Sequence, residues 1–272
     1  MKHSKIFLLI CLLSCQVGVA QELYMFTNPA SNIPAKAWVV KGMGKAIASS
    51  HHKGGEYRFA PECQVGLNKN WMVSGGLSFS DMFERSGLQF ESFRGYAKYR
   101  FLSLDDVHRH FRMAVHGSYA WSNNPLRYQE LNFEGDHSGF QWGIIGTGLV
   151  HKLAVSGGVS LLQRMGSQTK PALNVRVSDQ AMGYHLSAGY LLFPLRYKDY
   201  RQVNVNLYVE LLGQRNLDMK AGFMDVAPAI QFVFASRLRI NAGARYQLYG
   251  STSRMATQAA YLSMEYYFLN SL

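Results

Sequence analysis

The feature that most constrains this chain is a two-residue alternation of apolar and polar side chains, repeated in many segments of about ten residues. In the run 260–268, one set of alternate residues is Leu262, Met264, Tyr266 and Phe268, and the other is Tyr261, Ser263, Glu265 and Tyr267. A β-strand points successive side chains to opposite faces, so such a segment needs apolar surroundings on one side only. A soluble sandwich would turn the apolar face inward, whereas a membrane barrel would turn it outward to lipid.

The N-terminus has the pattern of an export signal. A basic start, Met1–Lys5, precedes an apolar run, Ile6–Leu13, that is too short to span a bilayer and ends near the small residue Ala20. Residues 1–20 are therefore predicted to be a signal peptide cut before Gln21. An alternative is a lipobox ending at Cys15, which would leave a lipid anchor on that residue.

The same alternation predicts twelve strands after this signal. Their expected ranges are 36–46, 56–67, 71–80, 89–102, 110–122, 140–150, 153–161, 181–192, 202–212, 224–234, 238–249 and 260–268. Pro61 has no N–H to give to a sheet ladder, which counts against a regular strand around it. An even number of strands places both chain ends on one side of a bacterial barrel.

The connections between these segments alternate in length, which is typical of outer-membrane barrels. Short links include 68–70 and 151–152, and longer ones include 123–139 and 164–180. We therefore predict an all-β, transmembrane, antiparallel up-and-down barrel of about 12 strands over 36–268. A periplasmic lead-in, 21–35, precedes it and a tail, 269–272, follows it. Phe268, at the end of the last strand, is expected at the membrane interface, where that strand pairs with the first.

Composition and cysteine usage agree with export to an outer membrane. The chain is 48% hydrophobic and 13% aromatic, with 25 glycines in 272 residues. The apolar stretches that follow the predicted signal peptide are too short for a transmembrane helix. Loss of Lys2 and Lys5 with the signal lowers the formal charge from +11 to +9. That excess favours anionic head groups or solutes over nucleic acid. Cys63 alone would remain as a cysteine, at an apolar position, which excludes an internal disulfide.

Several stretches resemble a family of outer-membrane β-barrel proteins from Bacteroidetes. They are 22–36 (ELYMFTNPASNIPAK), 99–113 (YRFLSLDDVHRHFRM), 210–214 (ELLGQ) and 225–232 (DVAPAIQF). The resemblance spans nearly all of the mature chain and implies the same fold and location. Members of the family are generally described as putative transporters, and the family supplies no catalytic or binding residues.

Motifs for enzymatic or metal chemistry are weak. His108 and His110 lie near two aspartates in a predicted turn, and His51 and His52 lie in a predicted loop, but a zinc site needs further ligands with second-shell support. Nothing in the sequence selects Ser156, His151 and Asn204 as a hydrolase triad from the many other residues of these types, because no Gly-x-Ser-x-Gly elbow is present. Gly146–Gly148 lies in a strand pattern without the helix of a dinucleotide site. We predict no metal, no cofactor and no catalytic residues.

The remaining constellation is the set of charges predicted to face the barrel lumen. The cations are Lys41, Lys45, Arg58, Arg94, Lys98, Arg100, Arg112, Arg239 and Arg245, and the anions are Glu56, Glu62, Glu210, Asp225 and Glu265. Arg100 and Arg112 are expected close together across one hairpin, with Glu210, Asp225 and Glu265 as the internal acidic partners. Nine cations against five anions predict an electropositive constriction.

These patterns favour a monomeric, passive, porin-like channel of the cell outer membrane, surrounded by outer-membrane lipid. It would carry small solutes with a mild preference for anions. A non-transporting structural or surface-binding barrel is the alternative, and an outer-membrane lipid hydrolase is a third hypothesis. A barrel of twelve strands lies between those filled by side chains and those with a water channel, so the lumen could be narrow or plugged.

Overall fold

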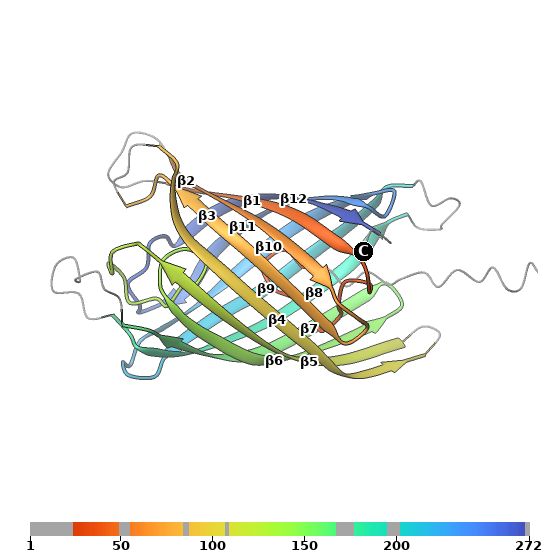
Figure 1. Cartoon of the computed structure of the whole chain (residues 1–272), viewed down its shortest axis with the longest axis horizontal. Helices are drawn as coiled ribbons and strands as arrows, with labels where there is room; N and C mark the ends of the chain where they lie inside the picture. The colour runs from red at the N-terminus through yellow and green to blue at the C-terminus, as the bar shows by residue number, and fades with distance from the viewer. Residues whose placement is uncertain are drawn as a thin grey trace, which may run out of the picture.

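The computed structural model describes residues 24–48, 55–83, 87–106, 109–166, 177–194 and 202–269. Over these residues the strands are antiparallel, each pairs with its neighbours in the sequence, and β1 pairs with β12 to close the barrel (Figure 1). The strands are β1 (Trp38–Ala48), β2 (Gly55–Gly66), β3 (Trp71–Ser80), β4 (Gln89–Asp105), β5 (Arg109–Ser122), β6 (Gly139–Val150), β7 (Leu153–Arg164), β8 (Gln180–Phe193), β9 (Asn204–Asn216), β10 (Gly222–Phe234), β11 (Leu238–Gly250) and β12 (Gln258–Phe268). The predicted fold class is confirmed.

Parts of the predicted organisation lie outside the described residues. They are the signal peptide 1–20, the start of the lead-in up to residue 23, and the tail from 270 on. The alternative lipid anchor at Cys15 falls in the first of these parts. No segment of the described chain forms a helix long and apolar enough to cross a membrane.

The barrel closes where the sequence predicted, between its last strand and its first. Trp38 is opposite Phe268 in the β1–β12 register, and their rings stack with centroids 4.0 Å apart. Lys41 is opposite Glu265 three residues further along the same pair of strands. An apolar contact on the outer face and a charge pair on the inner face therefore fix one register, since a slip by one residue would exchange the two faces.

The two faces of the wall differ as the alternation predicted, and the apolar face points outward. In β12, Leu262 is 61% exposed, whereas its neighbour Ser263 is 2% exposed. In β1, Val40 is exposed and Val39 is buried. A soluble sandwich would bury the apolar face, so this arrangement excludes it. Large hydrophobic side chains instead cover the outside of the barrel.

Two strands depart from regular pairing for identifiable reasons. Pairing of β2 with β3 passes from Phe59 directly to Glu62, which leaves Pro61 without a β3 partner, as its missing N–H requires. The β3–β4 pairing has a β-bulge next to Phe79, opposite Phe90. A bulge places two residues of one strand against one of the other, so the inward and outward positions shift beyond it.

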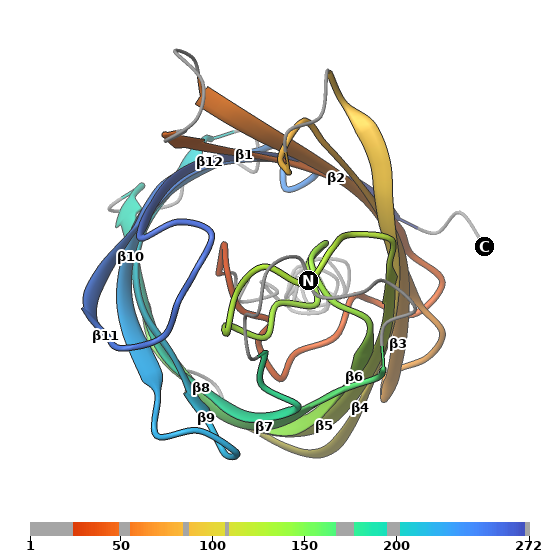
Figure 2. The same cartoon turned by 90° about the vertical axis from the view of Figure 1, so that its left-hand side faces the viewer.

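The irregular segment 24–37, which we call the plug, lies inside the barrel (Figure 2). Its two Xaa-Pro sequences, Asn28–Pro29 and Ile33–Pro34, remove backbone donors and keep it from pairing as a strand. Packing fixes it instead. Met25 belongs to an apolar cluster that includes Tyr208 of the inner wall, and Ala30 packs in a second cluster with Ala114 and Ile145. The plug enters from the end of the barrel where the shorter turns and the C-terminus lie (Figure 1).

The loop 123–138 between β5 and β6, which we call the latch loop, folds into the lumen from the opposite end (Figure 2). Leu131 and Phe133 are 2% and 3% exposed and pack on Leu162 of β7. The backbone N–H groups of Gln129 and Glu130 both donate to the carbonyl of Ser253, in the β11–β12 loop. Two segments thus occupy the lumen, one from each end.

The plug is seated against β2 so closely that only glycine fits at Gly66. A Cβ at that position would lie 2.2 Å from the carbonyl oxygen of Pro34, whereas a Cβ at Gly75 would meet no atom within 4 Å. We expect Gly66→Ala to displace the plug and Gly75→Ala to leave it in place. Hydrogen exchange of the amides of 33–37 measures this. Equal protection in the two variants would contradict the described seating.

Candidate functional site in the barrel lumen

Lys98, a predicted pore-lining cation, is buried beneath the plug and does not line an open pore. Its ammonium donates to the carbonyl oxygens of Pro29 and Ser31, each at 2.7 Å, and the side chain is 1% exposed. Arg112, on the adjacent strand β5, donates to Ser31 Oγ at 2.8 Å and pairs with Asp105 at 2.9 Å. Two of the predicted cations therefore hold the plug.

Glu210 has a different role from the one expected. The sequence predicted it as an internal partner of lumen cations, but its Oε1 accepts the backbone N–H groups of Met25 and Phe26, each at 2.9 Å. Its Oε2 accepts the hydroxyl of Thr27 at 2.6 Å. The carboxylate thus binds a turn of backbone, because two successive N–H groups of the plug point at one oxygen. Glu210 and Lys98 fix two different parts of the plug.

Arg100 and Arg112 do not form the repelling pair that the hairpin predicted. A register shift between Arg100 and Leu102 places Arg100 opposite Ala114, and Arg112 opposite Ser103. Arg100 donates to the carbonyl of Lys69 in the β2–β3 turn at 2.6 Å. The two guanidinium groups therefore bind different partners, and the alternation could not locate the register shift.

The strands next to the seam carry the pairs that the sequence did predict. Glu265 lies 3.5 Å from Lys41 and 3.7 Å from Arg239. The Arg239 guanidinium also contacts Tyr267, with its carbon 3.7 Å from the ring centroid and a hydrogen bond to the hydroxyl. Asp225 pairs with Arg245, as expected. Glu265 and Asp225 therefore act as internal acidic partners.

Asp225 also joins the barrel wall to the β11–β12 loop. Arg254, which the strand pattern could not place because it lies in a loop, donates to Asp225 Oδ1 at 2.7 Å. The same guanidinium pairs with Glu130 of the latch loop at 2.9 Å and lies over the ring of Phe223. One arginine therefore fastens two loops and one strand together.

The second fastening of the latch loop is a buried cluster around Arg58. Arg58 forms ion pairs with Glu91 and with Asp136, and all three side chains are buried. Glu91 also accepts hydroxyl hydrogen bonds from Ser78 and Ser80, each at 2.5 Å. The sequence prediction missed Glu91 because it lies in the β3–β4 bulge, where the alternation breaks.

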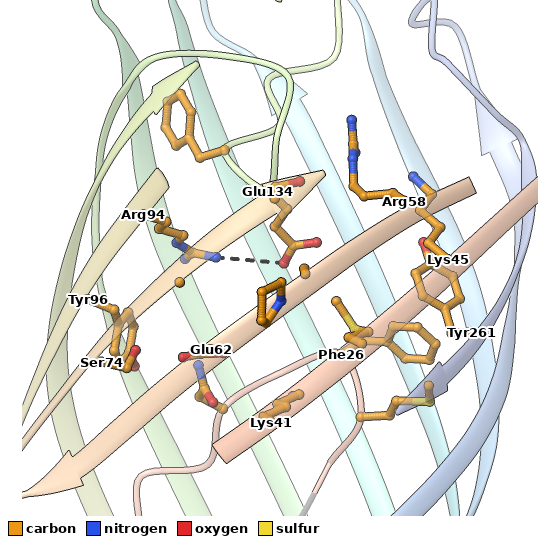
Figure 3. A pocket seen from close by; sticks show the side chains of 18 of the residues that line it. Phe26, Lys41, Lys45, Arg58, Glu62, Ser74, Arg94, Tyr96, Glu134 and Tyr261 are labelled. Carbon is orange, nitrogen blue, oxygen red and sulfur yellow. Dashed lines mark ion pairs between the residues drawn. The ribbon is translucent and has the colours of Figure 1, made fainter. Parts of the chain in front are cut away.

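Between the plug and the latch loop lies a cavity of about 150 Å³, which we call the central cavity (Figure 3). Its wall includes aromatic rings of Phe26 and Tyr261, charged groups from β1, β2 and β4, and the Arg94–Glu134 pair at 3.7 Å. Two of the predicted site residues, Arg94 and Arg245, line this space, and both are partly buried. The cavity is large enough for several water molecules or a small solute.

Acidic residues outside the predicted inward set pair with arginines of the lumen. Among the described residues these are Glu91, Asp105, Glu130, Glu134 and Asp136. The latch loop and the β11–β12 loop also bring two arginines that the strand pattern did not place, Arg127 and Arg254. Over the described residues, Lys and Arg still outnumber Asp and Glu by 19 to 14, so the electropositive constriction remains a prediction.

The groups considered for metal or hydrolase chemistry have ordinary structural roles where they are described. Ser156 is buried, shares a hydrogen bond with Thr147 Oγ1 and donates to the carbonyl of Gly146. His110 Nδ1 lies 2.8 Å from Asp105, and no group of three metal-ligating side chains occurs among the described residues. His108, His51 and His52 lie outside the described residues.

Comparisons with known proteins find the fold and no family. No family model and no curated protein matches the sequence. An outer membrane channel from Pseudomonas putida F1 is similar over 90% of this chain and 100% of its own, with a TM-score of 0.56 and 11% identity. The β domain of a Bordetella autotransporter covers 85% of this chain and 98% of its own, with a TM-score of 0.48 and 14% identity. Outer membrane phospholipase A from Escherichia coli covers 91% and 95%, with a TM-score of 0.45 and 10% identity. The similarity to the P. putida channel supports the closed barrel fold.

We expect loss of the Glu210 carboxylate to release the start of the plug. Glu210→Ala leaves the N–H groups of Met25 and Phe26 without their charged acceptor, and hydrogen bonds to a charged group contribute about 1.5–3 kcal/mol. Exchange of these two amides should therefore accelerate about tenfold or more. Glu265→Gln is the matched control, since it alters a lumen carboxylate that does not bind the plug. The assignment is wrong if both variants protect these amides as the unmodified protein does.

Docking of the latch loop should weaken on acidification. Burial lowers the pKa of His137, whose Nδ1 accepts the N–H of Asn132. Burial opposes ionisation of Asp136, but neighbouring cations, Arg58 above all, outweigh it and lower the pKa of that carboxyl. Both pKa values are depressed in the docked state, so the docked loop takes up protons less readily than the released loop. The contribution of these two groups to the free energy of docking is therefore fully present at neutral pH.

That contribution is lost as the pH falls, first below the ordinary histidine value of about 6.5 and then, for Asp136, below about 4. Hydrogen exchange of 131–138 between pH 7.5 and 5 measures the first step, after correction for the intrinsic pH dependence of exchange. His137→Gln should flatten the response in that range. A loop that is released on alkalinisation, or a response unchanged in this variant, would refute the assignment.

Proposed function

We propose that this protein is a passive, porin-like channel of a bacterial outer membrane, and that the plug and the latch loop hold it in a closed conformation. The proposed unit is a monomer in outer-membrane lipid. The closed β1–β12 seam supports the monomer, because neither strand is left with an open edge. The apolar outer face and the sequence of the export signal support the location. The resemblance to Bacteroidetes barrels is part of the same proposal.

The observation that carries the transport proposal is the central cavity. It lies in the barrel interior and is bounded by two segments that are not part of the wall. The plug is bound through Lys98 and Glu210, and the latch loop through Arg58 and Arg254. Neither segment contributes a strand to the barrel, so either could move while the barrel remains closed. Displacing both would join the cavity to each side of the membrane.

A structural or surface-binding barrel is the second candidate, and the buried ion pairs favour it. A lumen filled by fixed pairs such as Arg58–Glu91 could serve stability alone. The lipid hydrolase hypothesis has less support, because the Ser156 hydroxyl is buried and bonded to Thr147 inside the barrel. The fold of the P. putida channel agrees with transport but, at 11% identity, does not assign a solute to this chain.

Conductance in planar bilayers tests the channel directly. We expect the unmodified protein to show small or infrequent openings and a variant lacking residues 24–34 to show a severalfold larger conductance, because the plug fills the lumen. Lys98→Met tests the same point with the chain intact. Heat-modifiable migration on gels and a strand-rich circular dichroism spectrum confirm that each variant is folded. If folded plug-deleted protein shows no conductance and no solute flux in liposomes, the structural barrel is the better description.

A further inference from the structure

Cations outnumber acidic residues in the lining of the central cavity. Two acidic residues, Glu62 and Glu134, line it. Its lining cations are Lys41, Lys45, Arg58, Arg94 and Arg245. Several of their counter-ions are absent from this lining, since Glu265, Glu91 and Asp225 each lie outside it. The cationic groups therefore stand between the cavity and these carboxylates.

Lys45 is a lining cation that forms no ion pair within the described part of the chain. It is opposite Arg58 in the β1–β2 register, and the two carboxylates nearest that arginine, Glu91 and Asp136, are engaged by its guanidinium. No carboxylate of the described residues lies within 4.0 Å of the Lys45 ammonium. Its nitrogen lies 6.0 Å from the centroid of the Tyr261 ring. Arg58 is thus neutralised by its own carboxylates, whereas the three N–H groups of the Lys45 ammonium remain available to the carboxylate of a solute.

Aromatic surface lies beside this ammonium. The rings of Phe26 and Tyr261 meet edge to face with centroids 4.8 Å apart, and both line the cavity. Figure 3 shows Lys45, Tyr261 and Phe26 gathered on one side of the cavity and the Arg94–Glu134 pair on the other. Such a wall favours a flat apolar group over a fully hydrated inorganic ion.

The cavity also has a continuation toward the outer loops. A second space of about 20 Å³ is lined by residues of the latch loop, the β11–β12 loop and the wall, and its charged groups are Glu130, Glu134, Asp136 and Asp225 with Lys45, Arg245 and Arg254. Lys45, Glu134, Arg245 and Tyr261 line both spaces. Lys45 therefore stands at the junction, where a solute entering between the two loops would first reach the central cavity.

We infer that the central cavity is a binding site for a small organic anion that carries a flat apolar group, with an aromatic monocarboxylate as its simplest form. Lys45 holds the carboxylate, and the Phe26–Tyr261 pair packs against the ring. The inference rests on the proposed function, because it names the class of solute that the channel would select. Arg94 remains paired with Glu134 and closes the far side of the site.

Benzoate binding to the purified protein in detergent micelles tests this site. Saturation-transfer NMR, with empty micelles as the blank, should detect benzoate and give a dissociation constant. Benzyl alcohol, a neutral probe of similar size, should bind at least tenfold more weakly, and acetate should bind weakly because it lacks the ring. Lys45→Met keeps the length of the side chain but removes its charge, and should weaken benzoate binding about tenfold or more.

Matched variants separate this site from general charge or micelle effects. Lys69→Met removes an exposed lysine of the β2–β3 turn and should leave benzoate binding unchanged. Tyr261→Leu should weaken benzoate more than acetate, because it removes aromatic surface. Equal binding of benzoate and benzyl alcohol, or unchanged benzoate binding in folded Lys45→Met, would overturn the inference.

The outcomes are distinguishable from those of the transport proposal. A protein that conducts ions but does not bind benzoate remains a channel without the proposed selectivity site. A protein that binds benzoate through Lys45 but gives no conductance after plug deletion is a binding barrel, and the transport proposal fails alone. Blockade of the current by benzoate, reduced in Lys45→Met and unchanged in Lys69→Met, would support both.

Discussion

A charge inside a barrel loses much of its hydration, so the protein must supply a partner for it. This requirement explains why the lumen is filled. Arg239 and Arg245 have carboxylate partners on neighbouring strands, but Lys98 and Glu210 are satisfied by backbone groups of the plug. Removal of the plug would therefore leave a buried cation and a buried anion to be solvated by water. The plug and the inner wall depend on each other.

The two segments in the lumen are bound by different chemistry. The plug is bound mainly by hydrogen bonds between its backbone and buried side chains, whereas ion pairs anchor the latch loop to Arg58, Arg94 and Arg254. Ionic strength screens partly exposed pairs such as Arg94–Glu134 more than buried hydrogen bonds. Salt and acid should thus act first on the loop. The two ends of the barrel need not open under the same conditions.

The alternation of side chains predicted the twelve strands, the seam and the outward apolar face, because the two-residue period of a strand can be read from the local sequence. It could not predict features that depend on breaks in that period. Glu91 lies in a bulge, Arg100 precedes a register shift, and Glu130 and Asp136 lie in a loop whose path no strand pattern describes. The sequence pattern also could not predict that the plug lies inside the barrel, since its prolines indicate only that it is not a strand.

A local anion site depends on which charges lie beside one another, because electrostatic energy depends on the arrangement of charges and not on their total alone. At Lys41 the neighbouring groups across the two adjacent strands are Glu62 and Glu265, so the ammonium is compensated on both sides. Four residues further along β1, the corresponding neighbours of Lys45 are Arg58 and Tyr261. The change from acidic neighbours to a cation and a ring occurs at the junction of the cavity with the outer loops. The anion preference that we propose therefore depends on Lys45 and not on the arginines of β4, β5 and β11.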